Sequence, residues 1–423
     1  MKAEISDDVI RGMITLALGS GVGRLIGIAA IPLLTRLYSP DDFGVLAVFS
    51  AFIAILAPIL TMRYVLTLPL PRHDGLAMNL LAVSVSLMLV MSTLITLLLW
   101  LGGETFLNLV SMPVLAPWWW LIPLGAFGTA AYEVLALWAT RKRAYKLISQ
   151  TSIIQSAAGA VVKIGLGLVA LQPLGLLIGQ VLAQAGGIGR MFREFWPEFQ
   201  ESWRHVSANR MRKAAWQHKG FPIWRVPSQF LMVLSMQAPM LFIAALYDAD
   251  TTGHFGLALM VLSLPMNIIG QSAGKALYGE ASKTIKDNPK QVAQMARDLQ
   301  FRLLLIALLP VLIIFKFSED LFSIIFGTEW ATAGSFASIL AFAMLFQFTS
   351  APLIQLMNLL SKQSAFLAIN VLRLLGLVAI FYTAHFYNFS AISFVTLYAI
   401  YTALFYLAVS AFVLRAVTAI SSR

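Results

Sequence analysis

The chain has 423 residues, of which 59% are hydrophobic and only 12% are charged, and its mean hydropathy is +0.81. A soluble domain cannot bury that share of apolar side chains and keep a polar exterior, so the composition excludes an ordinary soluble enzyme. The net charge is +11, and the absence of cysteine excludes disulfides, iron–sulfur clusters and thiol catalysis.

Apolar runs follow one another along the chain, and a run of about twenty residues is long enough to cross a ~30 Å hydrocarbon layer as a helix. We predict an all-α polytopic membrane protein with about twelve transmembrane helices, because the short alternating segments of a porin-like barrel are missing. The N-terminus has mixed charge and no small-residue cleavage site, so we expect a retained first helix. The predicted spans are 13–37, 43–69, 76–101, 116–140, 147–171, 173–193, 220–247, 253–279, 300–317, 332–360, 364–386 and 390–415.

The predicted connection from residue 194 to residue 219 is the longest, and it mixes Trp and Phe with Lys and Arg. This composition is typical of an amphipathic helix that lies in the membrane interface. A plain solvated linker is the alternative.

Most Lys and Arg residues lie at the two termini or in even-numbered connections, as in residues 141–146. The odd-numbered connections instead carry acidic residues such as Asp41, Asp42 and Glu104. Because cytoplasmic loops are enriched in Lys and Arg, we predict a multi-pass protein of the bacterial inner membrane with both termini in the cytoplasm. The positive charge reflects this bias and does not indicate nucleic-acid binding.

The sequence also contains an internal repeat. The segment LYSPDDFGVLA at 37–47 recurs as LYDADTTGHFGLAL at 246–259, and further segments recur in the same order at offsets between 209 and 220. Six helices per copy give both copies the same orientation, as in transporters whose site lies between two lobes near the midplane. We predict an N-terminal lobe of residues 1–205, which holds helices 1–6 and the start of the linker. The C-terminal lobe of residues 206–423 holds helices 7–12.

Charged residues inside a membrane are costly and usually face a cavity or a partner. Glu133 is the acidic position within the predicted spans, whereas six basic positions lie at least four residues inside a span: Arg24, Arg63, Lys163, Arg225, Lys275 and Arg373. Arg225 and Lys275 lie near cytoplasmic helix ends, where snorkelling explains them equally well. Arg24, Lys163 and Arg373 lie near the middle of their spans, and for them the alternative is a structural pair with Glu133 or with a backbone carbonyl.

Neutral polar side chains recur at helical spacing in two of the predicted spans, so they form polar stripes, one of which includes Lys275. The residues are Ser263, Asn267, Gln271 and Lys275 in the eighth span, and Gln347, Gln355 and Asn358 in the tenth. Interhelical hydrogen bonding is the alternative, and it explains the serines of 149–156 in the fifth span well. At an offset of 212, Lys275 corresponds to Arg63, so we predict that the two lobes present matched cations.

This excess of cations predicts an anionic cargo, because Arg forks and Lys point charges both bind phosphate. A lipid-linked sugar carries a diphosphate that cannot cross the bilayer unaided, and its hydroxyls suit amide side chains. Outward movement of each negative charge gains about 2.3 kcal/mol per 100 mV when the interior is negative. The predicted substrate-binding residues are the six cations with Asn267, Gln271, Gln355 and Asn358, and we predict no cofactor and no metal site.

The stretch GSGVGRLIGIAAIPLLTRLYSPDDFGVLAVFSAFIAILAPI at 19–59 resembles the opening of Wzx-type O-antigen and polysaccharide flippases. These belong to the multidrug/oligosaccharidyl-lipid/polysaccharide (MOP) superfamily, and FGTEWATAGSFASILA at 326–341 resembles the start of their tenth helix. The resemblance implies a MATE-like fold of two six-helix lobes related by a parallel pseudo-two-fold repeat. It further implies flipping of an undecaprenyl-diphosphate-linked oligosaccharide through a cationic central cavity.

The resemblance implies partners and roles as well. The partners would be the lipid-linked oligosaccharide, membrane lipids, and the polymerase and chain-length regulator of the same pathway. Glu133 would be the candidate for ion coupling, and the protein would not be an enzyme. A multidrug antiporter of the same superfamily and a lipid II flippase are the alternatives, but the first needs acidic cavity residues and the second carries fourteen helices. A membrane ligase or polymerase would have a large external loop, which this sequence lacks.

Overall fold

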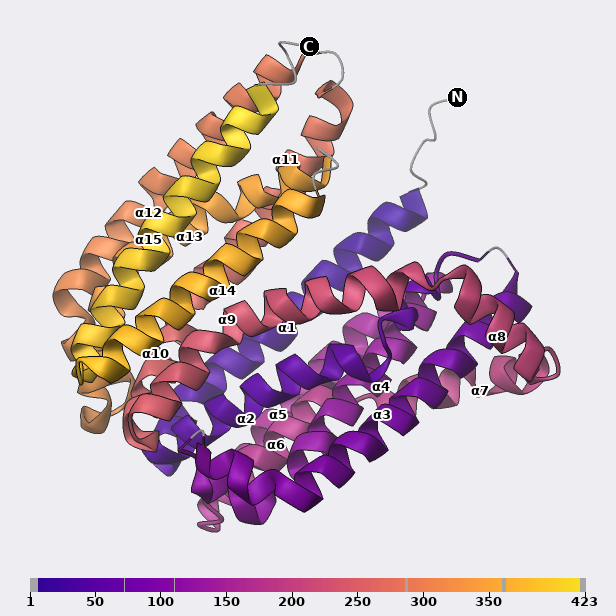
Figure 1. Cartoon of the computed structure of the whole chain (residues 1–423), viewed down its shortest axis with the longest axis horizontal. Helices are drawn as coiled ribbons and strands as arrows, with labels where there is room; N and C mark the ends of the chain where they lie inside the picture. The colour runs from indigo at the N-terminus through magenta and orange to yellow at the C-terminus, as the bar shows by residue number, and fades with distance from the viewer. Residues whose placement is uncertain (1–6, 72, 110, 286–287, 360–362, 419–423) are drawn as a thin grey trace. The chain divides into compact units, whose positions relative to one another are not determined.

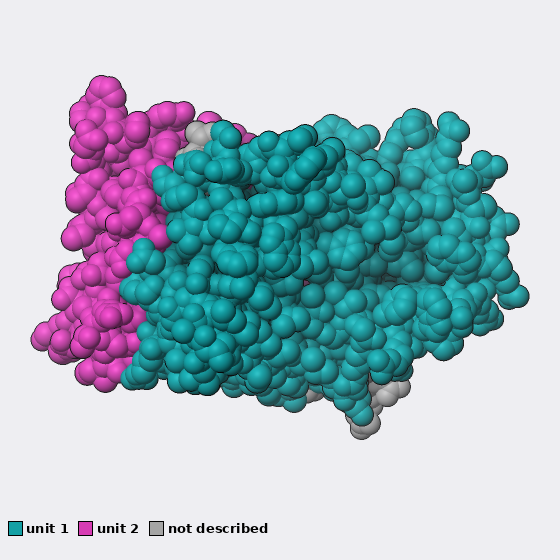
Figure 2. Space-filling view, turned by 90° about the horizontal axis from the view of Figure 1, so that it is seen from below, with its two compact units in different colours: residues 1–233 teal, residues 234–423 magenta. Residues whose placement is uncertain are grey.

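The computed structural model describes residues 7–71, 73–109, 111–285, 288–359 and 363–418. Nearly all of these residues are helical and none of them forms a β-strand, so the predicted all-α class is confirmed. The chain divides into two compact units, Met1–Val233 and Leu234–Arg423 (Figure 2). The predicted lobe division after residue 205 rests on the sequence repeat and stays a prediction.

The first unit is built from long helices that pack along one another and ends in two shorter ones. They are α1 (Asp7–Leu37), α2 (Pro40–Leu60), α3 (Asp74–Leu109), α4 (Leu121–Arg141), α5 (Tyr145–Leu168), α6 (Leu174–Ala185), α7 (Ile188–Trp203) and α8 (Ala208–Gln217). Helix α5 packs against both α1 and α6, and α4 packs against α2 and α6 (Figure 1).

The second unit has long helices of the same kind. They are α9 (Val226–Leu246), which begins in the first unit, α10 (Ala249–Pro265), α11 (Gln271–Thr284), α12 (Pro289–Phe326), α13 (Ala331–Leu359), α14 (Gln363–Phe386) and α15 (Ala391–Thr418). Helix α13 lies at the centre of the packing, since α10, α11, α12 and α15 all contact it.

Corresponding side chains begin the second helix of each sequence repeat. Ser39 caps α2 by accepting a hydrogen bond from the backbone N–H of Asp42, whose carboxylate accepts in return from the Ser39 N–H. Asp248 caps α10 by accepting from the Thr251 N–H. Both caps satisfy backbone donors that a helix leaves unpaired at its start. The repeated segments LYSPDD and LYDADT therefore both encode an N-terminal helix cap.

Ten helices in the described part of the chain are long and apolar enough to cross a membrane. Two predicted spans, 173–193 and 253–279, are not among them. The first is interrupted after α6, where Gly187 has a φ of +86° and a Cβ atom would meet Thr151. The second is divided at Pro265 into α10, a π-helical turn and α11. A hydropathy pattern averaged over a whole span does not detect such breaks, because apolar residues continue on both sides of each one.

Three predicted boundaries are wrong. The second span was placed at 43–69, but α2 ends at Leu60, and Met62 and Arg63 follow with positive φ values of 46° and 59°. The third and ninth spans were expected to end at 101 and 317, but α3 and α12 continue to Leu109 and Phe326. At 1.5 Å per residue both helices exceed the ~30 Å hydrocarbon layer, so their ends extend beyond it.

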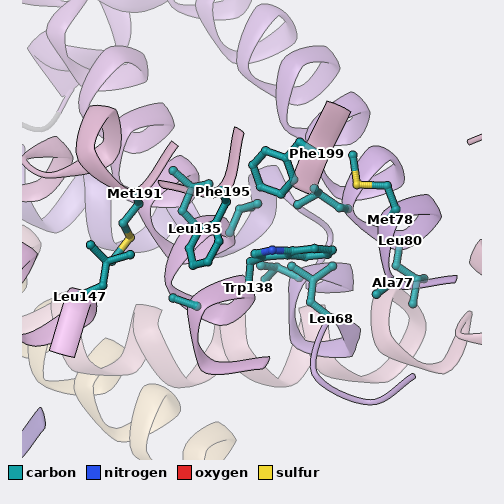
Figure 3. Packing of buried hydrophobic residues seen from close by; sticks show 14 of the residues in the cluster. Leu68, Ala77, Met78, Leu80, Leu135, Trp138, Leu147, Met191, Phe195 and Phe199 are labelled. Atoms are coloured by element: carbon teal, nitrogen blue, oxygen red, sulfur yellow. The ribbon is translucent and has the colours of Figure 1, made fainter. Parts of the chain in front are cut away.

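The linker folds as helices α7 and α8 on the first unit. Figure 3 shows Phe195 and Phe199 of α7 beside Trp138 of α4, whose side chain is fully buried. The Trp138 and Phe199 rings meet edge to face at 5.4 Å. The predicted amphipathic helix is therefore present, and it begins at Ile188, six residues before the expected start at 194.

Candidate functional site

Arg63 and Glu133 form an ion pair inside the first unit. Nη1 of Arg63 donates to Oε1 of Glu133 at 3.0 Å, and the two side chains are 11% and 31% exposed. Glu133 lies on α4, and Arg63 lies just after the end of α2. Helices α2 and α4 pack against each other. Glu133, the predicted alternative partner of Arg24, Lys163 and Arg373, is therefore paired with Arg63 instead.

The Arg63 site is incompletely satisfied. Arg63 precedes the 3₁₀ turn η1 (Tyr64–Thr67) in a left-handed backbone conformation, which is costly for a residue other than glycine. Its buried Nε and the hydroxyl of Thr61 have no hydrogen-bond partner among the described residues. A buried donor without a partner costs free energy.

Lys163 of α5 is held by a neutral partner on α6. Its Nζ donates to Oε1 of Gln180 at 2.7 Å, and its own carbonyl accepts from the Tyr38 hydroxyl at 2.7 Å. The aliphatic stem of Lys163 lies against Gly179, where a Cβ atom would overlap it. Glycine at this position therefore allows α5 and α6 to approach closely around the lysine.

Arg373 of α14 is enclosed by aromatic side chains of α15. Its guanidinium carbon lies 6.0 Å from the ring centre of Phe405 and 5.6 Å from that of Tyr406. Cation–π contacts of this kind are worth ~0.5–2 kcal/mol each, more when desolvated. The Tyr401 hydroxyl donates to the Arg373 carbonyl at 3.1 Å, which ties α15 to the same turn of α14.

Lys163 and Arg373 lie on α5 and α14, in the fifth predicted span of each sequence repeat, but not at matching positions. They are 210 residues apart (373 − 163), whereas the repeat offset just before these spans is 220 (361 − 141). Among the described residues neither makes an ion pair with a carboxylate, and the partners shown are neutral. The sequence predicts both cations within membrane spans, but it does not predict their neutral partners.

The other predicted site residues divide into exposed and undescribed ones. Arg24, Arg225, Lys275 and Gln355 are exposed, whereas the side chains of Asn267, Gln271 and Asn358 lie outside the described residues. Lys275 and Arg63 thus have different surroundings, because one is exposed and the other is buried and paired. Their functional equivalence stays a prediction.

The serines of α5 lie where α1 packs against it. A Cβ atom on Gly19 would overlap Ser149, and one on Gly23 would meet the Ser152 carbonyl at 3.0 Å and the Ser156 hydroxyl at 3.1 Å. Small residues spaced by four allow two membrane helices to approach closely. Close packing of α1 on α5 therefore explains the small residues of this stripe, whereas the interhelical hydrogen bonding considered for these serines stays a prediction. Arg24 follows directly after Gly23, beside this contact.

Two tyrosines were missed as positioning residues. The Tyr38 hydroxyl donates to the Lys163 carbonyl, and the Tyr247 hydroxyl donates to the Phe389 carbonyl at 2.9 Å. Burial, together with the Asp42 carboxylate, raises the pKa of Tyr38 to about 12, and burial raises the pKa of Tyr247 as well. Both hydroxyls therefore remain donors at neutral pH. The repeated LY dipeptide was the available signal.

Comparison with known proteins supports a transport role. The sequence profile of a family named "Polysaccharide biosynthesis protein" matches residues 33–335. The succinoglycan biosynthesis transport protein ExoT of Rhizobium meliloti (strain 1021) is 23% identical over 326 residues. That match covers 74% of this chain and 61% of ExoT, so the chain spans less than two thirds of that relative.

Solved structures show the same fold at low sequence identity. An inward-facing multidrug resistance MATE family transporter of the MOP superfamily is 12% identical with a TM-score of 0.64, covering 100% of this chain and 97% of that one. The lipid II flippase MurJ, in an inward closed conformation, is 11% identical with a TM-score of 0.67, covering 94% and 87%. The Vibrio cholerae MATE transporter VcmN, in a mutant form, is 15% identical with a TM-score of 0.61, covering 98% and 97%.

Proposed function

Because the chain belongs to the polysaccharide biosynthesis protein family, we propose that it is a flippase for a lipid-linked oligosaccharide. The cargo would be an O-antigen or exopolysaccharide repeat unit on undecaprenyl diphosphate. Transport would run from the cytoplasmic to the periplasmic leaflet of the bacterial inner membrane, with both termini in the cytoplasm. The relative ExoT, whose name assigns it to succinoglycan transport, supports a saccharide cargo.

The observation that carries the proposal is that the fifth predicted span of each repeat holds a cation, Lys163 or Arg373, without a carboxylate partner among the described residues. Both lie in membrane-spanning helices, and their contacts in the described chain are with neutral groups. A charge in low dielectric without a counter-charge is costly, so an anionic cargo would lower this cost at each of these residues.

The remaining predicted residues take supporting roles in this proposal. Arg24, Arg225 and Lys275 would add cationic contacts, and Gln355 with Asn267, Gln271 and Asn358 would bind glycan hydroxyls. Glu133 would couple transport to a proton or another cation, because its neutralisation would release Arg63 from the ion pair at 3.0 Å. No chemical step on the cargo is part of this function.

A multidrug antiporter of the same fold is the competing function, and the charges argue against it. Organic cations require acidic residues at their site. Glu133 is paired with Arg63, and the other charged positions we predicted within the spans are basic.

The test is genetic. Deletion of the gene should make lipid-linked oligosaccharide accumulate in the cytoplasmic leaflet, and the wild-type gene should reverse this. Lys163→Met and Arg373→Met should fail to complement, because each removes an unpaired positive charge. Lys316→Met is the matched control and should complement. It removes an exposed cation of α12 that is not among the predicted site residues. Normal oligosaccharide distribution in the deletion strain would overturn the proposal.

A further inference from the structure

Helix α7 carries two apolar stripes, of which the core of the first unit covers one. Met191, Phe195 and Phe199 are buried against α3 and α4 (Figure 3). Phe192, Trp196 and Trp203 form the second stripe, and they are 45%, 46% and 61% exposed. At 100° per residue these three lie within about 40° of one another on the helix surface. The second stripe is thus a continuous aromatic face that the described residues of the first unit leave about half exposed.

Charged and polar residues occupy the rest of α7. Arg193, Gln200 and Arg204 are exposed and continue around the helix from the aromatic face. A helix with a buried face, an aromatic face and a polar face suits a boundary between water and hydrocarbon, where Trp is enriched.

Helix α8 adds positive charge to this segment. Arg212, Lys213 and Trp216 are exposed on one side of α8, and the ammonium of Lys219 lies 4.1 Å from the Trp216 ring centre. Residues 208–219 contain no acidic residue. An indole surrounded by cations complements the anionic headgroups of a lipid surface.

Contacts to the membrane-spanning helices hold α7 at the level of their ends. Lys142, the residue after α4, pairs with Glu198 of α7 and, at 2.9 Å, with Asp74 at the start of α3. The Trp138 indole donates to Glu198 at 3.4 Å. Figure 1 shows α7 and α8 beside these ends of α3 and α4. The segment therefore lies where spanning helices leave the hydrocarbon layer.

We propose that α7 and α8 form a binding surface for anionic phospholipids, separate from the transported cargo. The aromatic face of α7 (Phe192, Trp196 and Trp203) inserts among the lipids, and Arg212, Lys213 and Lys219 contact headgroup phosphates. Insertion and charge act together, because one weak signal alone gives marginal membrane binding. Anionic lipid thereby fixes the position of the linker that leads into α9.

The natural absence of cysteine makes a depth measurement direct. Single variants Trp203→Cys and Gln200→Cys carry a spin label in the full-length protein, reconstituted in nanodiscs of phosphatidylcholine and phosphatidylglycerol. Position 203 should be more accessible to oxygen than to a water-soluble nickel chelate. Position 200, about one turn away on the polar face, should show the reverse. If both labels favour the nickel chelate, the aromatic face is in water or docks a protein, and the proposal is overturned.

A second measurement tests the charge. A label at Trp216→Cys should move toward the bilayer when phosphatidylglycerol is added to phosphatidylcholine nanodiscs, and the double variant Arg212→Gln/Lys213→Gln should lose this shift. An equal label depth in both lipid mixtures would overturn the anionic preference. Because transport is not measured, neither result depends on the proposed cargo.

Discussion

At the scale of single residues, the same kind of charge has three different surroundings in this protein. Arg63 is paired with a carboxylate, Lys163 is bound to an amide, and Arg373 is enclosed by aromatic rings. The sequence predicts that these cations lie within membrane helices, because long apolar runs surround each of them. It does not predict their partners, because Glu133 is separated from Arg63 by 70 residues and no local pattern joins them.

The ion pair gives the first residue-scale prediction. Arg63→Ala should lower the free energy of unfolding by about 1–3 kcal/mol, less than for a fully buried pair because Glu133 is partly exposed. The double variant Arg63→Met/Glu133→Leu should recover part of this loss, since it leaves neither charge unpaired. Thermal unfolding of the purified protein measures both effects.

The exposed Arg36→Ala variant is the control, and it should unfold at the wild-type temperature. Equal unfolding temperatures for Arg63→Ala and the wild type would show that the pair contributes nothing to stability.

At the scale of helices, the apolar runs predict most of the elements, but not where a helix breaks or turns. The sequence LGLLIGQVLAQAGGIG is apolar except for Gln180 and Gln184, yet α6 ends at Ala185, before Gly186 and Gly187, and α7 begins at Ile188. The same applies around Pro265, where a π-helical turn replaces a continuous span. These breaks depend on close contacts between helices, such as that of Gly187 with Thr151, which a single helix does not encode.

The contact between α5 and α6 gives a prediction at this scale. A methyl group in Gly179→Ala would overlap Lys163 Cγ and approach the Gly159 carbonyl, so the two helices or the lysine must move. We expect a loss of stability of about 1–3 kcal/mol, as for overpacked cores. Complementation should also fall, because the hydrogen bond between Lys163 and Gln180 depends on this geometry.

Gly165→Ala is the matched control on α5, since no atom lies within 4 Å of the added methyl group. It should retain stability and complementation. If both variants behave alike, close packing at Gly179 does not position Lys163.

At the scale of the whole molecule, the distribution of Lys and Arg predicts orientation. Reporter fusions must be placed after the true ends of α3 and α12, which lie at Leu109 and Phe326 instead of near 101 and 317. Reporter fusions after residues 112, 248 and 327 should therefore report the periplasm, and fusions after residues 143 and 219 should report the cytoplasm. A reversed signal at any of these positions would contradict the predicted topology.

The central claim is that the protein moves a lipid-linked oligosaccharide across the bilayer. The most direct measurement uses purified protein in proteoliposomes that contain polyprenyl-diphosphate-linked oligosaccharide, with transfer between leaflets followed by a membrane-impermeant lectin. We predict transfer above that of protein-free vesicles, with a marked loss in Lys163→Met and Arg373→Met. Transfer equal to protein-free vesicles, or equal transfer of an ordinary phospholipid, would contradict the proposed function.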